Sequence, residues 1–526
     1  MVQFITPAEA AAKIPDGSTI YMTGMGLGCF AEEVAIGIQD AFLAGGHPRD
    51  LTLYHSTGIG NGKDRGMHYF AHEGLLKRLV GGHFGVGGPA LMDLIHRRKV
   101  EAWNLPQGVL VHMPREIACR RPGLTTRVGL GTFVDPRIEG GKLNDISTED
   151  LVEVVTIEGE EWLRYKLPKP NVAMIRGSFA DEHGNISLDR EGVILEVLSV
   201  AQAAKACGGI VIAQVEHVVK AGSLHPRAVK VPGVTVDYVV VGKPEHHLQT
   251  MGTYFNPAYA GDIKVVTRSL PKLPLDPRKV VARRAAMELK PGAIANLGIG
   301  MPEGVGAVAA EENVGHLLTL TVETGPVGGI PASGLDFGHA TNAEAVIDQA
   351  AQFDFYDGGN LDIACLGLAQ TDPSGNVNVS KFSGRPVGCG GFINITQSAK
   401  EIVFCGTFTA GGLEVEIGGG RLKIVKEGKS RKFQTAVEQI TFSGAYANSI
   451  GQKVLYVTER AVFRLTPKGL KLIEIAPGVD LEKDVLAQMD FAPIVENPAL
   501  MPAFLFEEEW GGLSDHLAGK AAAARH

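Results

Sequence analysis

The chain has 526 residues, and its 50 Lys and Arg stand against 58 Asp and Glu, so the formal charge of −8 excludes a nucleic-acid binder that relies on a strongly basic surface. Glycine and proline, 67 and 28 residues, together make up about 18% of the chain, below the roughly 25–30% typical of disordered proteins. The 45% hydrophobic content suffices for large cores, and the length allows roughly two to four domains.

The N-terminal segment has the pattern of a short helix, a strand and a glycine-rich turn. It predicts a helix that ends before Asp16-Gly17, a strand at Thr19–Met22, and a turn that contains Gly24 and Gly26. A second, amphipathic helix is expected over residues 32–42. Because no basic region precedes an apolar run at the start of the chain, we expect no signal peptide.

His68 and His72 stand four residues apart and could share one face of a helix. The zinc-protease motif H-E-x-x-H needs a glutamate directly after the first histidine, where this chain has Tyr69. We therefore interpret the pair as surface or packing histidines. The six cysteines show neither metal-ligand spacing nor a CxxC pair, so we predict no metal site and a reducing compartment.

The most apolar stretch of the chain runs from Gly192 to Val219. Glu196, Lys205 and Glu216 interrupt this stretch, which makes it too polar to span a membrane. The sequence therefore predicts a soluble, cytoplasmic protein whose partners include neither a membrane nor a nucleic acid.

Two parts of the chain resemble each other. Residues 173–186 and 364–377 align at a constant offset, and each reads as an apolar strand, a D-x-x-G-N turn and another strand. Gln202-Ala-Ala-Lys205 likewise matches Gln397-Ser-Ala-Lys400, and each precedes an apolar strand. Two repeats of this length indicate a duplicated domain rather than a solenoid.

A proline-rich connector separates the two repeats. We predict an N-terminal domain over 1–268, a linker over 269–277 and a C-terminal domain over 278–526. Because strands alternate with amphipathic helices, we expect two related, open, largely parallel α/β/α domains in one chain, an α/β fold with the active site in a cleft at their interface.

A strand at 293–297 leads into Gly298-Ile-Gly300-Met301-Pro302, and the proline suits the start of a helix. Glycines let a ligand approach the backbone, and free N–H groups at a helix start favour negative charge. The alternative is a tight turn without a ligand. The pattern does not fit the dinucleotide motif G-x-G-x-x-G.

Glu323 follows an apolar stretch at 317–322 that reads as a buried strand, and Thr324 and Gly325 come next. In open α/β sheets the carboxyl ends of the strands form the ligand-binding edge. A carboxylate at this edge can act as a base, a metal ligand or a nucleophile. The alternative is a helix cap or a surface turn residue.

The last candidate segment is a loop with Gly388, Gly390 and Gly391, whose backbone could approach a ligand. Lys381 and Arg385 could meet phosphates, although a loop with solvated charges is the simpler interpretation. The same holds for Cys389 in this loop, where packing is the simpler alternative to a reactive thiol.

The two motifs Gly298-x-Gly300-x-Pro302 and Glu323-x-Gly325, in this order and within a duplicated chain, resemble the family I CoA-transferases. The E-x-G-P-x-G-G motif and the segments 353–359 and 388–395 look closest to those of the fused propionate/acetate CoA-transferases. The resemblance runs from about Ile5 to about Gly478. Thr324 departs from the Ser or Asn of many members, which leaves the acid substrate open.

The resemblance implies a mechanism. Glu323 would attack the thioester of a short-chain acyl-CoA to give an acyl–glutamyl anhydride, the CoA thiolate would then form a glutamyl-CoA thioester, and a second carboxylate would reverse these steps in ping-pong fashion. N–H groups of Gly298, Gly300 and Met301 would stabilise the oxyanions. CoA would be a substrate and covalent intermediate, with no permanently bound cofactor.

The remaining roles implied by the resemblance fall on both halves. Gln107, in a P-Q-G stretch, would approach the carboxylate substrate, Gly24 and Gly26 would line the same pocket, and Gly388, Gly390 and Gly391 would contact CoA. The family implies a homodimer or homotetramer. Two alternatives remain: an acyl-CoA thioesterase that uses the same glutamate, and a non-catalytic or sugar-phosphate-binding protein of similar fold. The preferred acid (acetate, propionate, butyrate, lactate or a 3-hydroxy acid) stays open.

Overall fold

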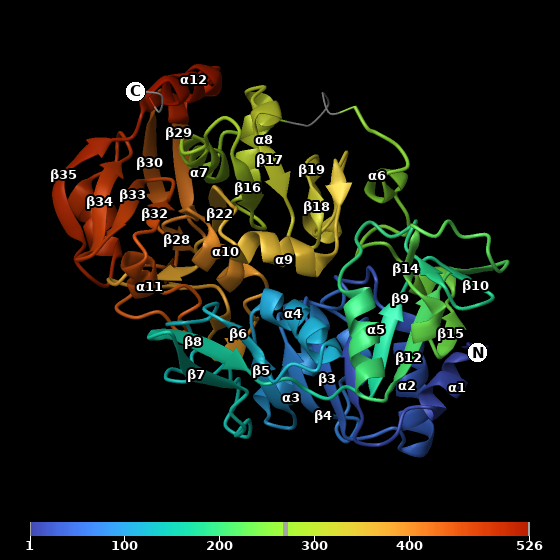
Figure 1. The fold of residues 1–526 in the computed structure, drawn as a ribbon. Coiled ribbons are helices and arrows are strands. Elements are labelled where there is room, and N and C mark those ends of the chain that lie inside the picture. Colours follow the sequence, from blue (N-terminus) through green and yellow to red (C-terminus); the bar gives the residue numbers. More distant parts are fainter. Residues whose placement is uncertain (1, 267–271, 524–526) are drawn as a thin grey trace.

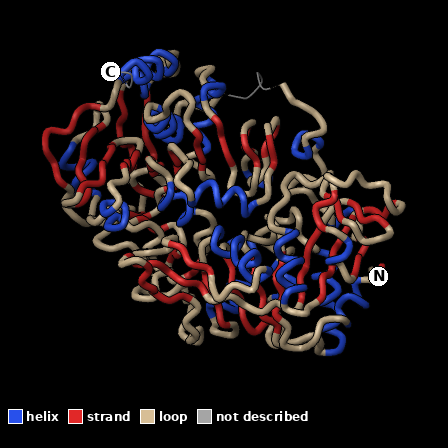
Figure 2. The backbone as a smooth tube through the Cα atoms, in the orientation of Figure 1, coloured by secondary structure: helices blue, strands red, loops and turns tan. Residues whose placement is uncertain are grey.

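The computed structural model describes residues 2–266 and 272–523, which form two halves of similar build (Figure 1). In each half, helices lie on both sides of a large sheet (Figure 2). Within the described residues, no helix combines the length and apolar character needed to cross a membrane.

The first half is built on an eight-stranded sheet in which every neighbouring pair is parallel. Buried β-branched and aliphatic residues dominate its central strands, as expected for a parallel sheet covered on both faces. In spatial order the strands are β1 (Gln3–Phe4), β15 (Tyr238–Val241), β12 (Ile210–Val215), β9 (Val172–Arg176), β2 (Thr19–Met22), β3 (Leu51–His55), β4 (Leu76–Gly81) and β5 (Glu101–Asn104).

Helices cover both faces of this sheet with separate apolar clusters. The first helix starts at Pro7, because Thr6 and Glu9 form a capping box, and it ends before Asp16-Gly17 as expected. One face is covered by α1 (Pro7–Ala12), α2 (Glu32–Gly45) and α3 (Pro89–His96), and the other by α4 (Gln107–Ala118) and α5 (Val197–Ala206).

The second half is built on a ten-stranded sheet whose centre is parallel. Antiparallel pairs extend it on both sides, and the last strand of the sheet pairs in parallel again. In spatial order the strands are β21 (Ala345–Val346), β18 (Pro326–Val327), β17 (Thr319–Thr321), β16 (Ile294–Leu297), β22 (Ile363–Gly367), β27 (Glu401–Cys405), β32 (Lys453–Val457), β33 (Ala461–Thr466), β34 (Gly469–Ile475) and β35 (Ile494–Leu500).

The helices of the second half again cover both faces. One face carries α7 (Pro277–Ala286), α8 (Glu303–Glu311) and α12 (Leu513–Ala523), and the other carries α9 (Gln349–Asp357), α10 (Phe392–Ser398) and α11 (Gly444–Ser449).

The remaining strands form small sheets and hairpins at the margins, and α6 (Pro257–Ala260) precedes the connector. These strands are β6 (Leu124–Thr126), β7 (Val152–Ile157), β8 (Glu160–Tyr165), β10 (Phe179–Asp181), β11 (Ile186–Ser187), β13 (His217–Val219), β14 (Val229–Val231), β19 (Ile330–Pro331), β20 (Ala340–Thr341), β23 (Gln370–Thr371), β24 (Val377–Asn378), β25 (Lys381–Phe382), β26 (Arg385–Pro386), β28 (Thr409–Ala410), β29 (Glu414–Gly418), β30 (Arg421–Lys426) and β31 (Ser430–Arg431).

The connector expected over 269–277 lies partly outside the described residues, which leave out 267–271. Its last two residues belong to a helix start, since Asp276 caps the helix α7 by accepting from the Lys279 N–H at 2.9 Å. The two large sheets take their strands from opposite sides of this connector. The domain bounds themselves stay a prediction.

The duplication expected from the sequence is visible in the topology. The order β15-β12-β9-β2-β3 of the first sheet corresponds to β32-β27-β22-β16-β17 of the second, and all these neighbours are parallel. The D-x-x-G-N turns match in detail. Asp181 accepts from Asn185 N and Nδ2 at 3.0 and 2.9 Å, and Asp372 accepts from Asn376 N and Nδ2 at 3.1 and 2.9 Å.

The two halves meet along the helices α4, α9 and α10, which lie against one another between the sheets (Figure 1). Their apolar cores interpenetrate there. Val111 of α4 packs into a core of the second half, while Cys389 and Ile393 pack into a core of the first. The carboxyl ends of strands from both sheets therefore face a common region.

Candidate functional site

Glu323 lies directly past the carboxyl end of β17, in a turn. The strand is shorter and more exposed than the buried run expected over 317–322, because only Thr319–Thr321 pair as a strand and Leu317 to Leu320 keep partial exposure. The turn is fixed by the Thr324 hydroxyl, which donates to the Gly338 carbonyl, and by the Val322 N–H, which donates to Pro326 O at 2.9 Å.

The Glu323 side chain is half-buried and borders the glycine loop before α10. A Cβ placed on Gly391 would lie 3.5 Å from Glu323 Cγ and 3.4 Å from Phe353 Cζ. Desolvation raises the pKa of the Glu323 carboxyl above its ordinary value, and the Asn296 side chain on β16 partly offsets this rise. A carboxylate with a raised pKa at a strand end is a candidate for catalysis.

Gln107 is brought to the same loop from the first half. It is the first residue of α4, and its N–H donates to Gly390 O at 2.9 Å. A Cβ on Gly390 would lie 3.6 Å from Gln107 Oε1. The Gln107 side chain is 4% exposed, and its Nε2 makes no hydrogen bond to any described residue. This amide is therefore available to a ligand beside Glu323.

The loop from Gly388 to Gly391 is held by the first half. Gly390 donates its N–H to Gly82 O at 2.8 Å, and Cys389 donates to Asn104 Oδ1 at 2.9 Å. Gly388 has a φ of 99°, and a side chain there would clash with His83 Cα at 2.7 Å, so this position needs glycine. Burial raises the pKa of the Cys389 thiol, which is packing material here rather than a reactive group.

The segment from Gly298 to Met301 lies at the end of β16, next to β17. The Gly298 N–H donates to Cys365 O at 2.8 Å, so it is not free to stabilise an oxyanion, and this part of the expectation is wrong. Gly300 is exposed, with a φ of 83° and open space around it. The helix α8 begins at Glu303, one residue later than expected, with Pro302 as its N-cap.

Gly24 and Gly26 belong to a loop that reaches the second half through Met25. A Cβ on Gly338, whose carbonyl holds Thr324, would lie 2.9 Å from the end of the Met25 side chain. Gly26 has a φ of 59°, and a side chain there would meet Met251 at 2.5 Å. The loop thus borders Gly338, whose carbonyl fixes the turn that carries Glu323.

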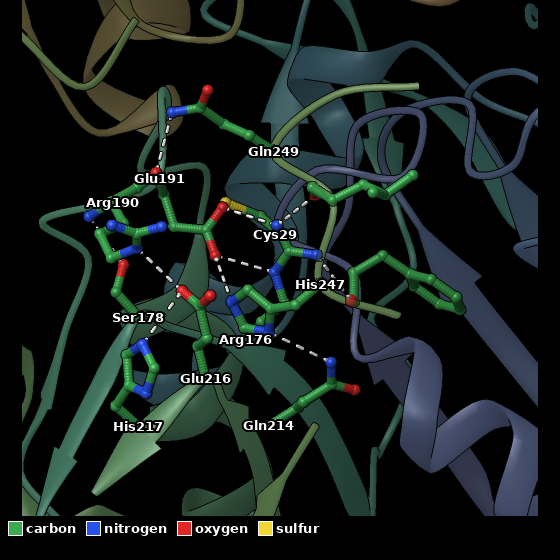
Figure 3. Close-up of polar contacts among 12 residues, drawn as sticks. Cys29, Arg176, Ser178, Arg190, Glu191, Gln214, Glu216, His217, His247 and Gln249 are labelled. Carbon is green, nitrogen blue, oxygen red and sulfur yellow. Dashed lines mark hydrogen bonds and ion pairs between the residues drawn. The ribbon is translucent and has the colours of Figure 1, made fainter. Parts of the chain in front are cut away.

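A buried ion-pair network supports this loop (Figure 3). Arg176 is fully buried, forms two hydrogen bonds of 2.8 and 2.7 Å with Glu191, and donates to Leu27 O and Leu248 O at 3.0 and 2.8 Å. The pKa of the Glu191 carboxyl lies well below its usual range because Arg176 and His247 outweigh its burial. The network fixes both the 24–28 loop and the start of the segment 191–196.

Sequence reasoning missed Ser56, Glu196 and Gln349, which gather near the same interface. Ser56 follows β3 and donates to Glu196 Oε1 at 2.7 Å, and the Gln349 N–H donates to Leu195 O at 3.1 Å. One signal was present, since Ser56-Thr-Gly stands after β3 as Glu323-Thr-Gly stands after β17.

Two further pairs of candidate residues lie on a 3-10 turn and on a hairpin. His68 lies in a 3-10 turn over Met67–Phe70 and His72 lies beyond it, hydrogen-bonded to Gln39 at 2.8 Å. Lys381 and Arg385 sit on the hairpin of β25 and β26, with Arg385 exposed. Among the described residues, no group of three or more His, Cys, Asp or Glu is arranged to hold a metal ion.

Comparisons with known proteins point to one family. The family model described as "Coenzyme A transferase" matches residues 4–242. The chain is 51% identical to caffeate CoA-transferase of Acetobacterium woodii over 99% of this chain and 100% of that one. It is 44% identical to acetate CoA-transferase YdiF of Escherichia coli O157:H7 over 94% of this chain and 93% of that one.

A solved structure agrees with these sequence relatives. The acyl-CoA transferase YdiF of E. coli O157:H7, described as a thioester complex with CoA, matches with a TM-score of 0.91 and 43% identity over 97% of both chains. The same fold is matched by its apoenzyme with the same TM-score.

Proposed function

Because the chain belongs to the coenzyme A transferase family, we propose that it moves CoA from a short-chain acyl-CoA to a short-chain carboxylate, with Glu323 as the covalent nucleophile. The enzyme class, a CoA-transferase, follows from relatives of 44–51% identity over nearly the whole chain. The intermediates, the acid substrates and the residue roles are the proposal.

The proposed reaction proceeds in two symmetric halves. The Glu323 carboxylate attacks the thioester carbonyl, which forms an acyl–glutamyl anhydride and expels CoA thiolate. The thiolate then attacks the glutamyl carbonyl, which forms a glutamyl-CoA thioester and releases the first acid as its carboxylate. A second carboxylate attacks this thioester and expels the thiolate again. The thiolate finally takes the new acyl group and regenerates Glu323.

Each attack passes through a tetrahedral oxyanion that needs hydrogen-bond donors. Gly391 borders Glu323, and we assign its N–H as a donor, together with the N–H groups of Gly300 and Met301 on the neighbouring turn. The Gln107 amide, which approaches from the other half, would orient the carboxylate substrate. Gly388 and Gly390 allow the thioester to lie against the backbone.

The observation that supports this proposal most strongly is the desolvated Glu323 carboxyl between Gly391 and Asn296. The first half contributes Gln107, whose N–H donates to the neighbouring Gly390 carbonyl. The YdiF structure, described as a thioester complex with CoA, is consistent with covalent chemistry in a relative. The two relatives are named for acetate and caffeate, and both of these acids are monocarboxylic.

The test of the proposal is a comparison of transfer with hydrolysis. The purified protein is mixed with acetyl-CoA or propionyl-CoA, with and without a second carboxylate, and CoA thiol and new acyl-CoA are quantified. The proposal expects new acyl-CoA only when the second acid is present, with little free thiol. Thiol release without an acceptor, at the rate of transfer, would identify a thioesterase instead.

We expect the acylation of Glu323 to have a pH dependence set by its raised pKa. The carboxyl must be ionised to attack, so the rate falls as the pH decreases through this pKa, and the fall begins at a higher pH than for an exposed glutamate. The measurement is kcat/KM for the acyl-CoA across acidic pH, at fixed ionic strength. A rate independent of pH down to the ordinary glutamate range would contradict this expectation.

Replacing Gln107 with alanine is expected to lower kcat/KM for the carboxylate acceptor by about 10- to 100-fold, because one buried hydrogen bond to the substrate is lost. KM for the acyl-CoA should change less than KM for the acid. Gln434→Ala is a suitable control, since the side-chain amide of Gln434 donates to Arg431 O at 2.9 Å within the second half. An equal loss for both substrates would argue against a role in binding the acid.

A further inference from the structure

The interface contains a second arrangement that resembles the Glu323 site. In this second arrangement the glutamate lies on the loop before a helix, and a serine takes the place after the strand. When Gln202 is aligned with Gln397, Leu195 and Glu196 correspond to Gly390 and Gly391. Leu195 has a φ of 55° and Gly390 a φ of 51°, so the two loops share an unusual backbone conformation. In the first half Glu196 faces Ser56 after β3, while in the second half Gly391 faces Glu323 after β17.

The two glutamines at the interface show the same correspondence between the halves. Gln107 is the first residue of α4 and donates its N–H to Gly390 O, while Gln349 is the first residue of α9 and donates its N–H to Leu195 O. Each helix therefore begins against the loop of the other half. Because the topology of the sheets is also repeated, Ser56, Glu196 and Gln349 occupy the counterpart of the Glu323 arrangement.

The two arrangements interlock in one region. Gln349 lies two residues after Ile347. The Ile347 N–H donates at 3.0 Å to the carbonyl of Gly325, which lies two residues past Glu323. From the other side, a Cβ on Gly82 would lie 2.0 Å from Ser56 O and 3.6 Å from Gln107 Cα. Residues next to Glu196 thus border both the strand end of Glu323 and the start of α4.

Polar atoms in this counterpart are buried without a hydrogen-bond partner among the described residues. The Glu196 and Gln349 side chains are both 0% exposed. Glu196 Oε2 and both atoms of the Gln349 amide make no hydrogen bond to any residue that the structure describes. Buried polar side chains are rarely left in this state in a folded protein, so they indicate a site for a small polar molecule.

The charge around Glu196 is negative. Among the described residues, the groups that act on its carboxyl are the Ser56 hydroxyl, the Asp348 carboxylate and the backbone N–H of Glu196 itself, and none of them is cationic. The charge of Glu196 also acts on the Tyr21 hydroxyl on β2 and on the Cys29 thiol, and burial raises the pKa of both groups. Burial raises the pKa of Glu196 to about 7, so it carries a charge above neutral pH.

The position of Glu196 is fixed by its chain neighbours. Glu191, five residues earlier, is anchored by Arg176 in the network of Figure 3. Between them the Val193 carbonyl accepts from Cys29 Sγ at 3.4 Å, and Leu195 is held by Gln349. The segment 191–196 is therefore tied to the protein at both ends.

We propose that Glu196 and Gln349 form the subsite for the acyl group, and that Glu196 excludes a second carboxylate, so that the enzyme takes monocarboxylic and rejects dicarboxylic acids. This inference rests on the proposed CoA transfer at Glu323. Gln349 would hydrogen-bond a neutral polar group of the acid, whereas a dicarboxylate would bring its second charge against the Glu196 carboxylate, on which no cation of the described residues acts. The one cation that acts on the neighbouring Asp348, among the described residues, is Arg115.

The test compares two probes of equal size, succinate and its neutral monoamide succinamate, as inhibitors of transfer to butyrate. The wild type should bind succinamate at least about tenfold more tightly than succinate near pH 8, because like charges repel in a buried site. The preference should grow from about pH 6 to about pH 8, across the pKa of Glu196. Glu196→Gln keeps the size and removes the charge, so it should abolish most of the preference and its pH dependence.

The exposed Glu344 provides the matched control, and Glu344→Gln should keep the wild-type preference. If Glu196→Gln does not fold, the pH series of the wild type still decides, because a preference constant within twofold from about pH 6 to about pH 8 contradicts the inference. If the wild type transfers no CoA, the proposed function fails and the inference fails with it. If transfer occurs and Glu196→Gln keeps the preference, only the role of Glu196 is wrong.

Discussion

Replacing Glu323 with alanine is expected to reduce CoA transfer by at least about 10⁴-fold, because the variant retains substrate binding but has no nucleophile. Glu323→Asp keeps a carboxylate but withdraws it from the thioester by one methylene. Such a displacement costs on the order of 10²-fold, so this variant should fall between the wild type and Glu323→Ala. The measurement is kcat/KM for propionyl-CoA with acetate as acceptor.

The control for this prediction is Glu344→Gln, which alters an exposed glutamate of the same half and should keep full activity. Folding of each variant is checked by its thermal unfolding midpoint. Retention of activity within tenfold in Glu323→Ala would mean that the nucleophile lies elsewhere.

Replacing Arg176 with methionine is expected to lower the free energy of unfolding by about 3–5 kcal/mol, because it leaves the buried Glu191 carboxylate without its main partner. Without Arg176, burial would raise the pKa of Glu191, and its protonation would relieve part of the cost. The deficit should therefore be larger near pH 8 than near pH 5. Because the wild-type pKa of Glu191 is depressed, the stability from the pair is present above the ordinary glutamate pKa and is lost as the pH falls below it.

Tryptophan fluorescence can follow this change in the first half alone. Two of the three tryptophans, Trp103 and Trp162, lie there, so a Trp510→Phe background reports the urea transition of that half. The control Arg97→Met removes exposed ion pairs to Asp93 and Glu73 and should cost less than about 1 kcal/mol. An equal cost for Arg176→Met and Arg97→Met would contradict the account of the network.

The sequence was sufficient for the duplication and for the position of Glu323. Strand ends and turns are local features, since an apolar run followed by D-x-x-G-N or E-T-G defines them within a few residues. The expected α/β fold with two related halves is confirmed by the matching strand order. The antiparallel pairs on both sides of the second sheet were not expected, because pairing direction depends on where the chain returns.

The missed residues depend on contacts between the halves. Glu196 stood out in the sequence only as an interruption of an apolar stretch, since its free oxygen and its pairing with Ser56 exist only after folding. The Gly298 N–H was expected to be free, but the neighbouring strand β22 accepts it through Cys365. Whether a polar group finds a hydrogen-bond partner depends on the tertiary structure, and a linear motif does not encode it.

The central claim, that Glu323 becomes covalently linked to CoA, is tested most directly by mass spectrometry. The protein is mixed with propionyl-CoA without an acceptor, treated with borohydride and digested. Borohydride reduces a glutamyl thioester to an alcohol, so the account predicts that the peptide with residue 323 carries this reduced side chain, only when acyl-CoA is present. An unmodified Glu323 in protein that is turning over, or a reduced glutamate at another position, would contradict it.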